Sequence, residues 1–302
     1  MKQAYGKEGI LVKIKMTLDE KLFSLINALF MLLVLFVTLY PFWYVVMASF
    51  SDNAAVLTNQ GLLLWPKGFN LDSYARVLKN NMIYIGYGNT IFILVIGTLL
   101  NLVMTALGAF VLSRKKLALK KLLMIIIVIT MYFDGGIIPT YLLVKNMGLI
   151  DSRWALILPG LVSTYNMVIL RTAFEAVPES LEESARIDGA SAYTILLKVM
   201  LPLAKPTLAV LVLYYGVGYW NSWFGAMIYL KSRTLFPLQL VLREILISGT
   251  NADMAAGSED AAQIAETLKY AVIVVSTLPI LCIYPFLQKF FEKGVMVGAV
   301  KG

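Results

Sequence analysis

Long continuous apolar runs constrain this chain more than any other feature of its sequence. The first runs from Leu22 to about Ala48, and similar runs recur at about 82–112, 206–227 and 268–290. A helix needs about 20 apolar residues to cross a bilayer, and these runs do not alternate with polar residues, so they predict spanning helices rather than a barrel. Hydrophobic residues are 59% and charged residues 15% of the chain, unlike a water-soluble domain. We therefore expect an all-α integral membrane protein.

The order of apolar and polar segments predicts six spanning helices with both termini in the cytoplasm. The other two helices are expected at about 122–143, interrupted by Tyr132 to Gly136 and by Pro139, and at about 154–170. With the N-terminus inside, the inside segments carry 17 Lys and Arg residues and the outside segments carry 8, with Lys269 at a helix end. This bias is typical of cytoplasmic loops. The resulting divisions are a cytoplasmic segment 1–21, a membrane domain 22–291 and a cytoplasmic tail 292–302.

The residue types that the chain lacks exclude several functions. It contains no histidine, and its single cysteine, Cys282, lies within an apolar run. Histidine-based acid–base chemistry, an internal disulfide and a His or Cys metal cluster are therefore excluded. A phosphate-binding G-x-x-x-x-G-K-[ST] loop is also absent from the sequence. From these missing residue types we expect no cofactor or metal in this chain and no enzymatic activity. The net charge of +8 is explained by helix orientation, so we expect no nucleic-acid partner.

A polar interval between the fourth and fifth apolar runs predicts two short helices. Ser180 and Glu183 have the spacing of a capping box, which predicts a helix start. Gly189 predicts the end of that helix, because glycine readily adopts the left-handed conformation. Ser191 is a candidate cap for a second helix, which is expected to end at Pro202. From these residues alone, binding a partner and packing on the chain's own helices have equal weight.

The same interval resembles the motif of a known family. Residues Glu183 to Ala190 (E-S-A-R-I-D-G-A) and Val199 to Pro202 (V-M-L-P) resemble the EAA motif of ABC importer permeases, with a serine for one alanine and a valine for the isoleucine. Over nearly its whole length the chain is similar to the smaller, MalG-like permease subunit of the carbohydrate-uptake group related to the maltose importer. The sequence at 133–141 and the 294–302 tail are most similar to LplC-type permeases for complex oligosaccharides.

This resemblance implies an ABC type I importer permease fold and a division of labour among subunits. The chain would form half of a translocation pathway with a second, homologous permease subunit in a bacterial cytoplasmic membrane. An extracytoplasmic binding protein, a lipoprotein, would deliver an oligosaccharide. The loop 173–203 would carry a coupling helix that docks on one of two copies of a cytoplasmic ABC ATPase, which bind ATP and Mg²⁺. The coupling residues that the resemblance implies are Glu182, Glu183, Ala185, Asp188, Gly189, Ala190 and Pro202.

Polar and aromatic side chains in or beside the apolar runs are candidates for the substrate pathway. Asp134 is notable because an ionisable group in such a run is costly unless it faces a cavity or a partner, so a sugar-binding wall and a structural aspartate have equal weight. Trp220 and Asn221 combine an aromatic face with an amide, which suits a sugar, whereas Trp223 is assigned to an interfacial belt. In maltose-type relatives the sugar site can lie wholly in the other permease subunit. The full candidate set is Tyr132, Asp134, Tyr141, Asn166, Trp220 and Asn221.

Two other classes of function are the alternatives. An ion-coupled secondary transporter would use Asp134 as its ion site, but it leaves the hairpin at 183–202 unexplained, and no inverted repeat is evident. A membrane-embedded enzyme has few catalytic sets to draw on without histidine. The outer intervals 51–80 and 231–266 are candidates for docking the binding protein or are solvated connectors. None of these features encodes which sugar is carried, its length or its charge.

Overall fold

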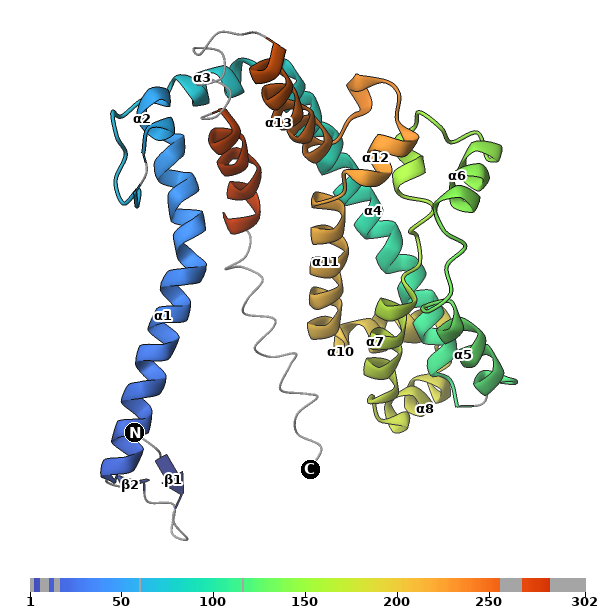
Figure 1. The fold of residues 1–302 in the computed structure, drawn as a ribbon. Helices are drawn as coiled ribbons and strands as arrows, with labels where there is room; N and C mark the ends of the chain where they lie inside the picture. Colours follow the sequence, from blue (N-terminus) through green and yellow to red (C-terminus); the bar gives the residue numbers. More distant parts are fainter. Residues whose placement is uncertain are drawn as a thin grey trace.

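In the residues that it describes, a computed structural model shows helices and one small β-hairpin (Figure 1). In that hairpin β1 (Gln3–Tyr5) pairs antiparallel with β2 (Leu11–Lys13). The described residues of the expected membrane domain, 22–291, form helices joined by loops, so the all-α prediction for that domain is confirmed. The expected tail 292–302 and the end of the expected sixth helix lie outside the described residues. The structure describes residues 3–5, 11–13, 17–59, 61–115, 117–255 and 268–282.

Among the described residues, two helices are each long and apolar enough to cross a membrane: α1 (Leu18–Ser49) and α4 (Asn81–Ser113). At 1.5 Å per residue they extend about 48 and 50 Å, well beyond the roughly 30 Å of a hydrocarbon core. α1 begins at a capping box, in which Thr17 Oγ1 accepts from the Glu20 amide and the Glu20 carboxylate accepts from the Thr17 amide. α1 stands apart from the body for most of its length, and its buried residues are confined to its last turn (Figure 1).

The body packs around α4, which contacts α7 (Thr164–Glu175), α11 (Lys205–Trp220) and α13 (Leu238–Ala255). Close approach to α11 depends on Gly97, because a Cβ at this position would lie 2.5 Å from the Tyr219 ring. The absence of a side chain therefore lets the two helices meet.

Buried polar groups fix the contacts of α4 with its neighbours. The Tyr219 hydroxyl donates to Asn101 Oδ1 (2.9 Å), and Asn101 Nδ2 donates to the Gly160 carbonyl (3.0 Å). Towards the other end of α4, Asn89 Nδ2 donates to the Thr234 carbonyl (2.9 Å). Because buried polar groups are costly unless paired, each of these bonds specifies which segment packs beside α4.

The expected third helix, 122–143, is two shorter helices. α5 (Lys120–Ile129) ends well before α6 (Ile137–Asn146) begins. Gly136, the N-cap of α6, has φ +84°, which glycine adopts without strain. The expected interruption is confirmed, although Pro139 lies within the first turn of α6, where its missing N–H is tolerated.

The expected fourth helix, 154–170, starts later in the structure, and the expected fifth helix ends earlier. α7 begins only at Thr164, after the Ser163 hydroxyl has capped it. α11 ends at Trp220, and the short helix α12 (Phe224–Tyr229) follows after a break. Both errors have one cause: caps and turns inside apolar runs are invisible to hydrophobicity alone.

Helix α13 occupies an interval, 231–266, that was expected to be polar and irregular. Its residues Leu238, Leu240 and Val241 are buried in a cluster with residues of α4. The sequence there mixes apolar and polar residues, so only its tertiary contacts make it a core helix. The helix Leu268–Cys282 covers the first part of the expected sixth helix.

Candidate functional site

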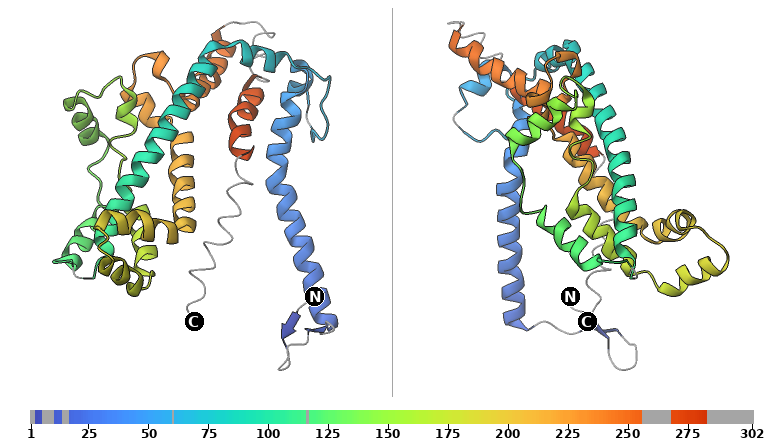
Figure 2. Two further views of the ribbon diagram at one scale, coloured as in Figure 1. Left: turned by 180° about the vertical axis from the view of Figure 1, so that it is seen from behind. Right: turned by 90° about the vertical axis from the view of Figure 1, so that its right-hand side faces the viewer.

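The candidate site is a helical hairpin at the same end of the molecule as the start of α1, opposite the end that carries the short helices α2 (Asn53–Leu57) and α3 (Asp72–Lys79) (Figures 1 and 2). Its first arm is α8 (Glu179–Ile187), and its second arm is the helical stretch Ala192–Leu203. The hairpin projects away from the body in the right-hand view of Figure 2.

The first arm starts differently from the expectation. Pro178 is the N-cap of α8, and no side chain caps the helix, so the capping box predicted at Ser180 and Glu183 is wrong. Glu179 and Glu182 lie in the first turn, where negative charge interacts favourably with the helix dipole. The fixed φ of proline and these charges replace a hydroxyl cap at the start of the helix.

The turn between the arms confirms two sequence predictions. Gly189 has φ +79°; its amide donates to the Arg186 carbonyl (3.0 Å), and the Ala190 amide donates to the Ala185 carbonyl (2.9 Å). This pair of bonds is a Schellman motif. The Ser191 hydroxyl then accepts from the Thr194 amide (3.3 Å) and caps the second arm.

The second arm continues past the proline that was expected to end it. Leu196–Met200 forms a π-helical turn in which the Leu201 amide donates to the Leu196 carbonyl, and helix continues through Leu203. The widened turn accommodates the ring and the missing N–H of Pro202. α11 then leaves the arm at an angle of 85°.

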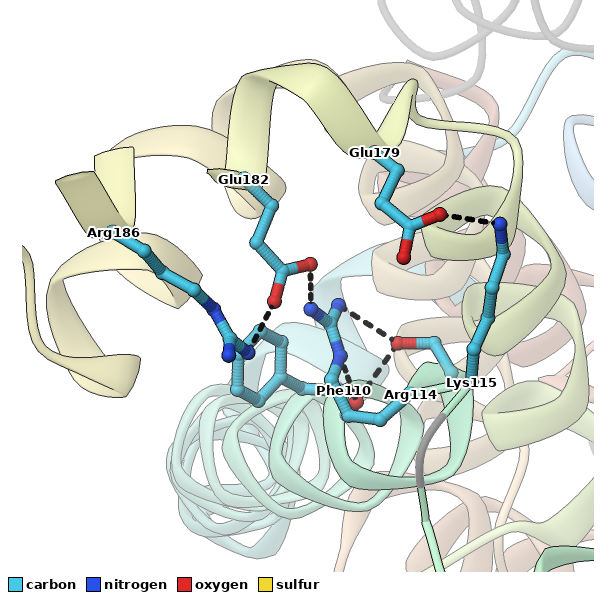
Figure 3. A network of polar contacts seen from close by, with 7 residues as sticks. Phe110, Arg114, Lys115, Glu179, Glu182 and Arg186 are labelled. Carbon is cyan, nitrogen blue, oxygen red and sulfur yellow. Dashed lines mark hydrogen bonds and ion pairs between the residues drawn. The ribbon is translucent and has the colours of Figure 1, made fainter. Parts of the chain in front are cut away.

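An ion pair between Arg114 and Glu182 joins the hairpin to α4 (Figure 3). Arg114 caps α4, and its Nε donates to the Phe110 carbonyl (3.1 Å) while its guanidinium lies 4.2 Å from the centre of the Phe110 ring. Arg186 Nη2 binds the other oxygen of Glu182 (2.7 Å). The side chains of Arg114 and Glu182 are 19% and 15% exposed, so this pair is shielded far more than an ordinary surface pair.

Three further ion pairs surround this contact. Lys115 Nζ binds Glu179 Oε2 (2.6 Å), and Glu175 Oε1 accepts from both Lys120 Nζ (2.8 Å) and Arg171 Nη2 (2.7 Å). A cavity of about 630 Å³ lies beside these ion pairs and is lined by residues from the end of α4 and from α8. Ion pairs therefore hold the side of α8 that faces this cavity.

The charges in this network are stable at neutral pH. Burial lowers the pKa of the Arg114 guanidinium, and the positive charge of Arg186 lowers that pKa further, whereas Glu179 acts in the opposite direction. Hydrogen bonding to Glu179 raises the pKa of the Lys115 ammonium. Both groups remain cations at neutral pH, and on the alkaline side the Lys115–Glu179 attraction is lost as the pH rises through the raised lysine pKa.

The hairpin residues selected from the sequence fall into two groups. Glu182 faces inward and is bound by two arginines, and Ala185 and Ala190 are half-buried against a core cluster. The exposed members are Glu183, Asp188, Gly189 and Pro202.

The sequence interpretation missed Arg114 and Glu179 as members of the site. The available signal was the dense basic cluster that begins at Arg114, matched by the acidic start of α8. It also missed an exposed apolar surface on the hairpin, where Ile187 is 86% and Tyr193 is 71% exposed.

The candidate pathway residues are dispersed over several elements. No hydrogen bond or ring contact joins any two of the six within the described part of the chain. Asp134 is exposed and its Oδ1 accepts from the Gly136 amide (3.1 Å), while Tyr141 stacks on Tyr229. Tyr132 and Asn221 are exposed, whereas Trp220 and Asn166 are buried among packed side chains.

Comparison with known proteins identifies relatives over most of the chain. Residues 104–297 match the family of binding-protein-dependent transport system inner membrane components. The polygalacturonan/rhamnogalacturonan transport system permease protein YtcP of Bacillus subtilis is 40% identical, with 94% of this chain and 100% of YtcP covered. Protein LplC of Bacillus subtilis is 41% identical, with coverages of 93% and 96%.

A solved structure shares the fold. It is the crystal structure of a bacterial ABC transporter involved in the import of the acidic polysaccharide alginate. One of its chains superposes with a TM-score of 0.84 at 32% sequence identity, covering 92% of this chain and 100% of that chain. The arrangement of helices described above is therefore the arrangement of that importer chain.

We expect Glu182→Gln to loosen α8, because it leaves the shielded Arg114 guanidinium without its charged partner. The local stability lost is about 1–3 kcal/mol, so amide hydrogen exchange in α8 should accelerate roughly ten-fold or more, as measured by mass spectrometry of the purified protein. Glu183→Gln is the matched control, because Glu183 is exposed on the same helix. Equal exchange rates in the two variants would show that the Arg114–Glu182 pair does not hold the hairpin.

Proposed function

The chain belongs to the family of binding-protein-dependent transport system inner membrane components, and from this membership we propose that it carries an oligosaccharide across the membrane. It is the permease subunit of an ABC importer, and it lies in the membrane. The oligosaccharide assignment is supported by the names of its relatives, which describe transport of polygalacturonan or rhamnogalacturonan and import of alginate. The ion-coupled alternative lacks this support, because an ABC importer is driven by ATP.

We propose six spans with both termini in the cytoplasm of a bacterium. The start of α1 and the hairpin lie at the same end of the molecule (Figure 2). The basic residues Arg114, Lys115, Lys120 and Lys121 also lie near this end, at the C-terminus of α4 and the start of α5. Because cytoplasmic loops are enriched in basic residues, the position of these four residues supports a cytoplasmic location for the end of the molecule that carries the hairpin.

The hairpin is the proposed docking element for a partner ATPase, and its exposed turn is the observation that carries this proposal. Gly189 keeps the turn narrow, and a Cβ there would meet no atom of this chain within 4 Å. Glu183 is exposed and able to pair with a basic group of the partner, and Ile187 adds apolar surface. ATP and Mg²⁺ are bound by two ATPase copies in this scheme, and this chain supplies no catalytic residue.

The Arg114–Glu182 pair is the proposed route by which movement of the hairpin reaches the membrane helices. α4 is the helix around which the body packs, so a hairpin fastened to its end displaces α7 and α11 together with it. Closure of the ATPases would then change the side of the membrane to which the pathway opens. A second, homologous permease subunit forms the other half of that pathway, and an extracytoplasmic binding protein supplies the sugar.

The proposed contribution of this chain to the sugar pathway lies at the break between α5 and α6. Irregular backbone at membrane depth is tolerated where it lines a water-filled cavity or is buried in protein. Asp134 is exposed there beside Tyr132, so a carboxylate and an aromatic ring are both available to a sugar. The buried Trp220 and Asn166 are weaker candidates, since reaching a sugar would require them to leave the core.

We expect Gly189→Asp to abolish transport by preventing close contact with the ATPase. Substrate-stimulated ATP hydrolysis by the reconstituted importer should fall at least about ten-fold, since a contact worth 1.4 kcal/mol changes an equilibrium ten-fold. Gly148→Asp is the matched control, because Gly148 also has positive φ (+70°) and open space around it but lies in the loop after α6, away from the hairpin. Normal stimulation in Gly189→Asp would contradict the docking role.

We expect Asp134→Asn to reduce uptake by removing the negative charge while keeping the hydrogen bond to the Gly136 amide. Uptake is measured at saturating concentration with a radiolabelled oligosaccharide that the intact importer accumulates, chosen from a panel of uronic and neutral oligosaccharides. Asp19→Asn is the control for loss of an acidic residue, because Asp19 is exposed in the first turn of α1, outside the intervals that are candidates for docking the binding protein. Unchanged uptake would remove Asp134 from the pathway.

A further inference from the structure

The segment between α2 and α3 turns back along α1 instead of extending beyond the end of that helix (Figure 1). The Leu63 amide donates to the Tyr40 hydroxyl (3.1 Å), and Trp43 Nε1 donates to the Leu64 carbonyl (3.0 Å). Leu63 itself is fully buried against the last turns of α1. The segment is therefore fastened beside α1 at the level of Tyr40 and Trp43.

The C-terminal end of this segment is also fixed to the chain that directly follows α1. The Asp52 amide donates to the Lys67 carbonyl (2.9 Å), the Lys67 amide donates to Ser51 Oγ (3.0 Å), and the Asn70 amide donates to the Phe50 carbonyl (2.9 Å). The height of the segment relative to α1 is thus set by several independent bonds.

Along the axis of α1, the segment lies at the level of residues that belong to the apolar run of this helix. Trp43 and Tyr40 precede the last residue of the helix, Ser49, by six and nine positions, which is about 9 and 13 Å along the axis. The apolar run from Leu22 to Ala48 extends about 40 Å, roughly 10 Å more than a hydrocarbon core. The segment therefore lies at the boundary between hydrocarbon and headgroups.

The side chains that the segment presents at this height are large and apolar. Leu62, Leu64 and Trp65 are 70%, 53% and 75% exposed. On α1 at the same level, Leu39 and Phe42 are 53% and 67% exposed. The segment extends the apolar surface of α1 and does not cover it.

We propose that residues 61–69 form a membrane anchor that inserts into the headgroup region of the leaflet opposite the hairpin. Lipid is the occupant that fits, because tryptophan is enriched at this boundary, and because the flanking surface of α1 is itself apolar and exposed in this chain, on a helix long and apolar enough to span the bilayer. The irregular backbone of the segment restricts it to the headgroup region, since unpaired N–H and C=O groups are costly in hydrocarbon. The anchor would fix the depth of α1.

Site-directed spin labelling of the assembled importer in lipid nanodiscs tests this anchor. The native Cys282 is first replaced by serine, and single cysteines are introduced as Leu62→Cys or Leu64→Cys for labelling. Leu39→Cys on α1 is the lipid-facing reference, and Asp72→Cys on α3 is the aqueous reference. Collision of each label with oxygen, which partitions into lipid, is compared with collision with a water-soluble nickel complex.

The anchor predicts that labels at 62 and 64 collide more with oxygen than with the nickel complex, as the label at 39 does. A ratio like that at 72 would place the segment in water and overturn the proposal. Exclusion of both reagents would also overturn it, because the segment would then be covered by another protein chain. Unaltered ATP hydrolysis of each labelled importer shows that the complex has assembled.

Discussion

One shielded ion pair connects the hairpin to the membrane helices, between the Arg114 guanidinium at the end of α4 and the Glu182 carboxylate near the start of the hairpin. Arg114 has little freedom to move, because it also bonds to the Phe110 carbonyl and lies over the Phe110 ring. Glu182 is held equally by Arg186 on its own helix. A contact fixed on both sides transmits force better than a flexible surface pair, which is worth only about 0–1 kcal/mol.

α4 connects this ion pair to other membrane helices, because several of them pack against α4. The α4 side chain of Asn101 bonds to the loop before α7 and to Tyr219 of α11. The α4 side chain of Asn89 bonds to the chain before α13. Small residues such as Gly97 let the neighbouring helices approach closely. Displacement of one end of α4 is therefore shared by helices that are distant in sequence.

Sequence patterns predicted the membrane class, the first two spans and the turn at Gly189, because each depends on local composition. They did not predict the helical boundaries near Thr164 and Trp220, which are set by caps and breaks inside apolar runs. α13 was missed because its helix is defined by burial against α4. In the site, the motif selected Glu182 and Glu183 together, and only the fold separates the inward carboxylate from the exposed one, since Arg114 is 68 residues away in sequence.

The proposed role of the Arg114–Glu182 pair requires the hairpin and α4 to move as one unit. Spin labels on Ser184 in α8 and Leu99 in α4, both exposed positions, allow the distance between these elements to be measured by pulsed electron resonance in the assembled importer. We expect the same distance distribution in the nucleotide-free importer and in the importer trapped with ATP. A shift of several ångströms between the two states would show that the hairpin moves independently of α4 and would contradict this expectation.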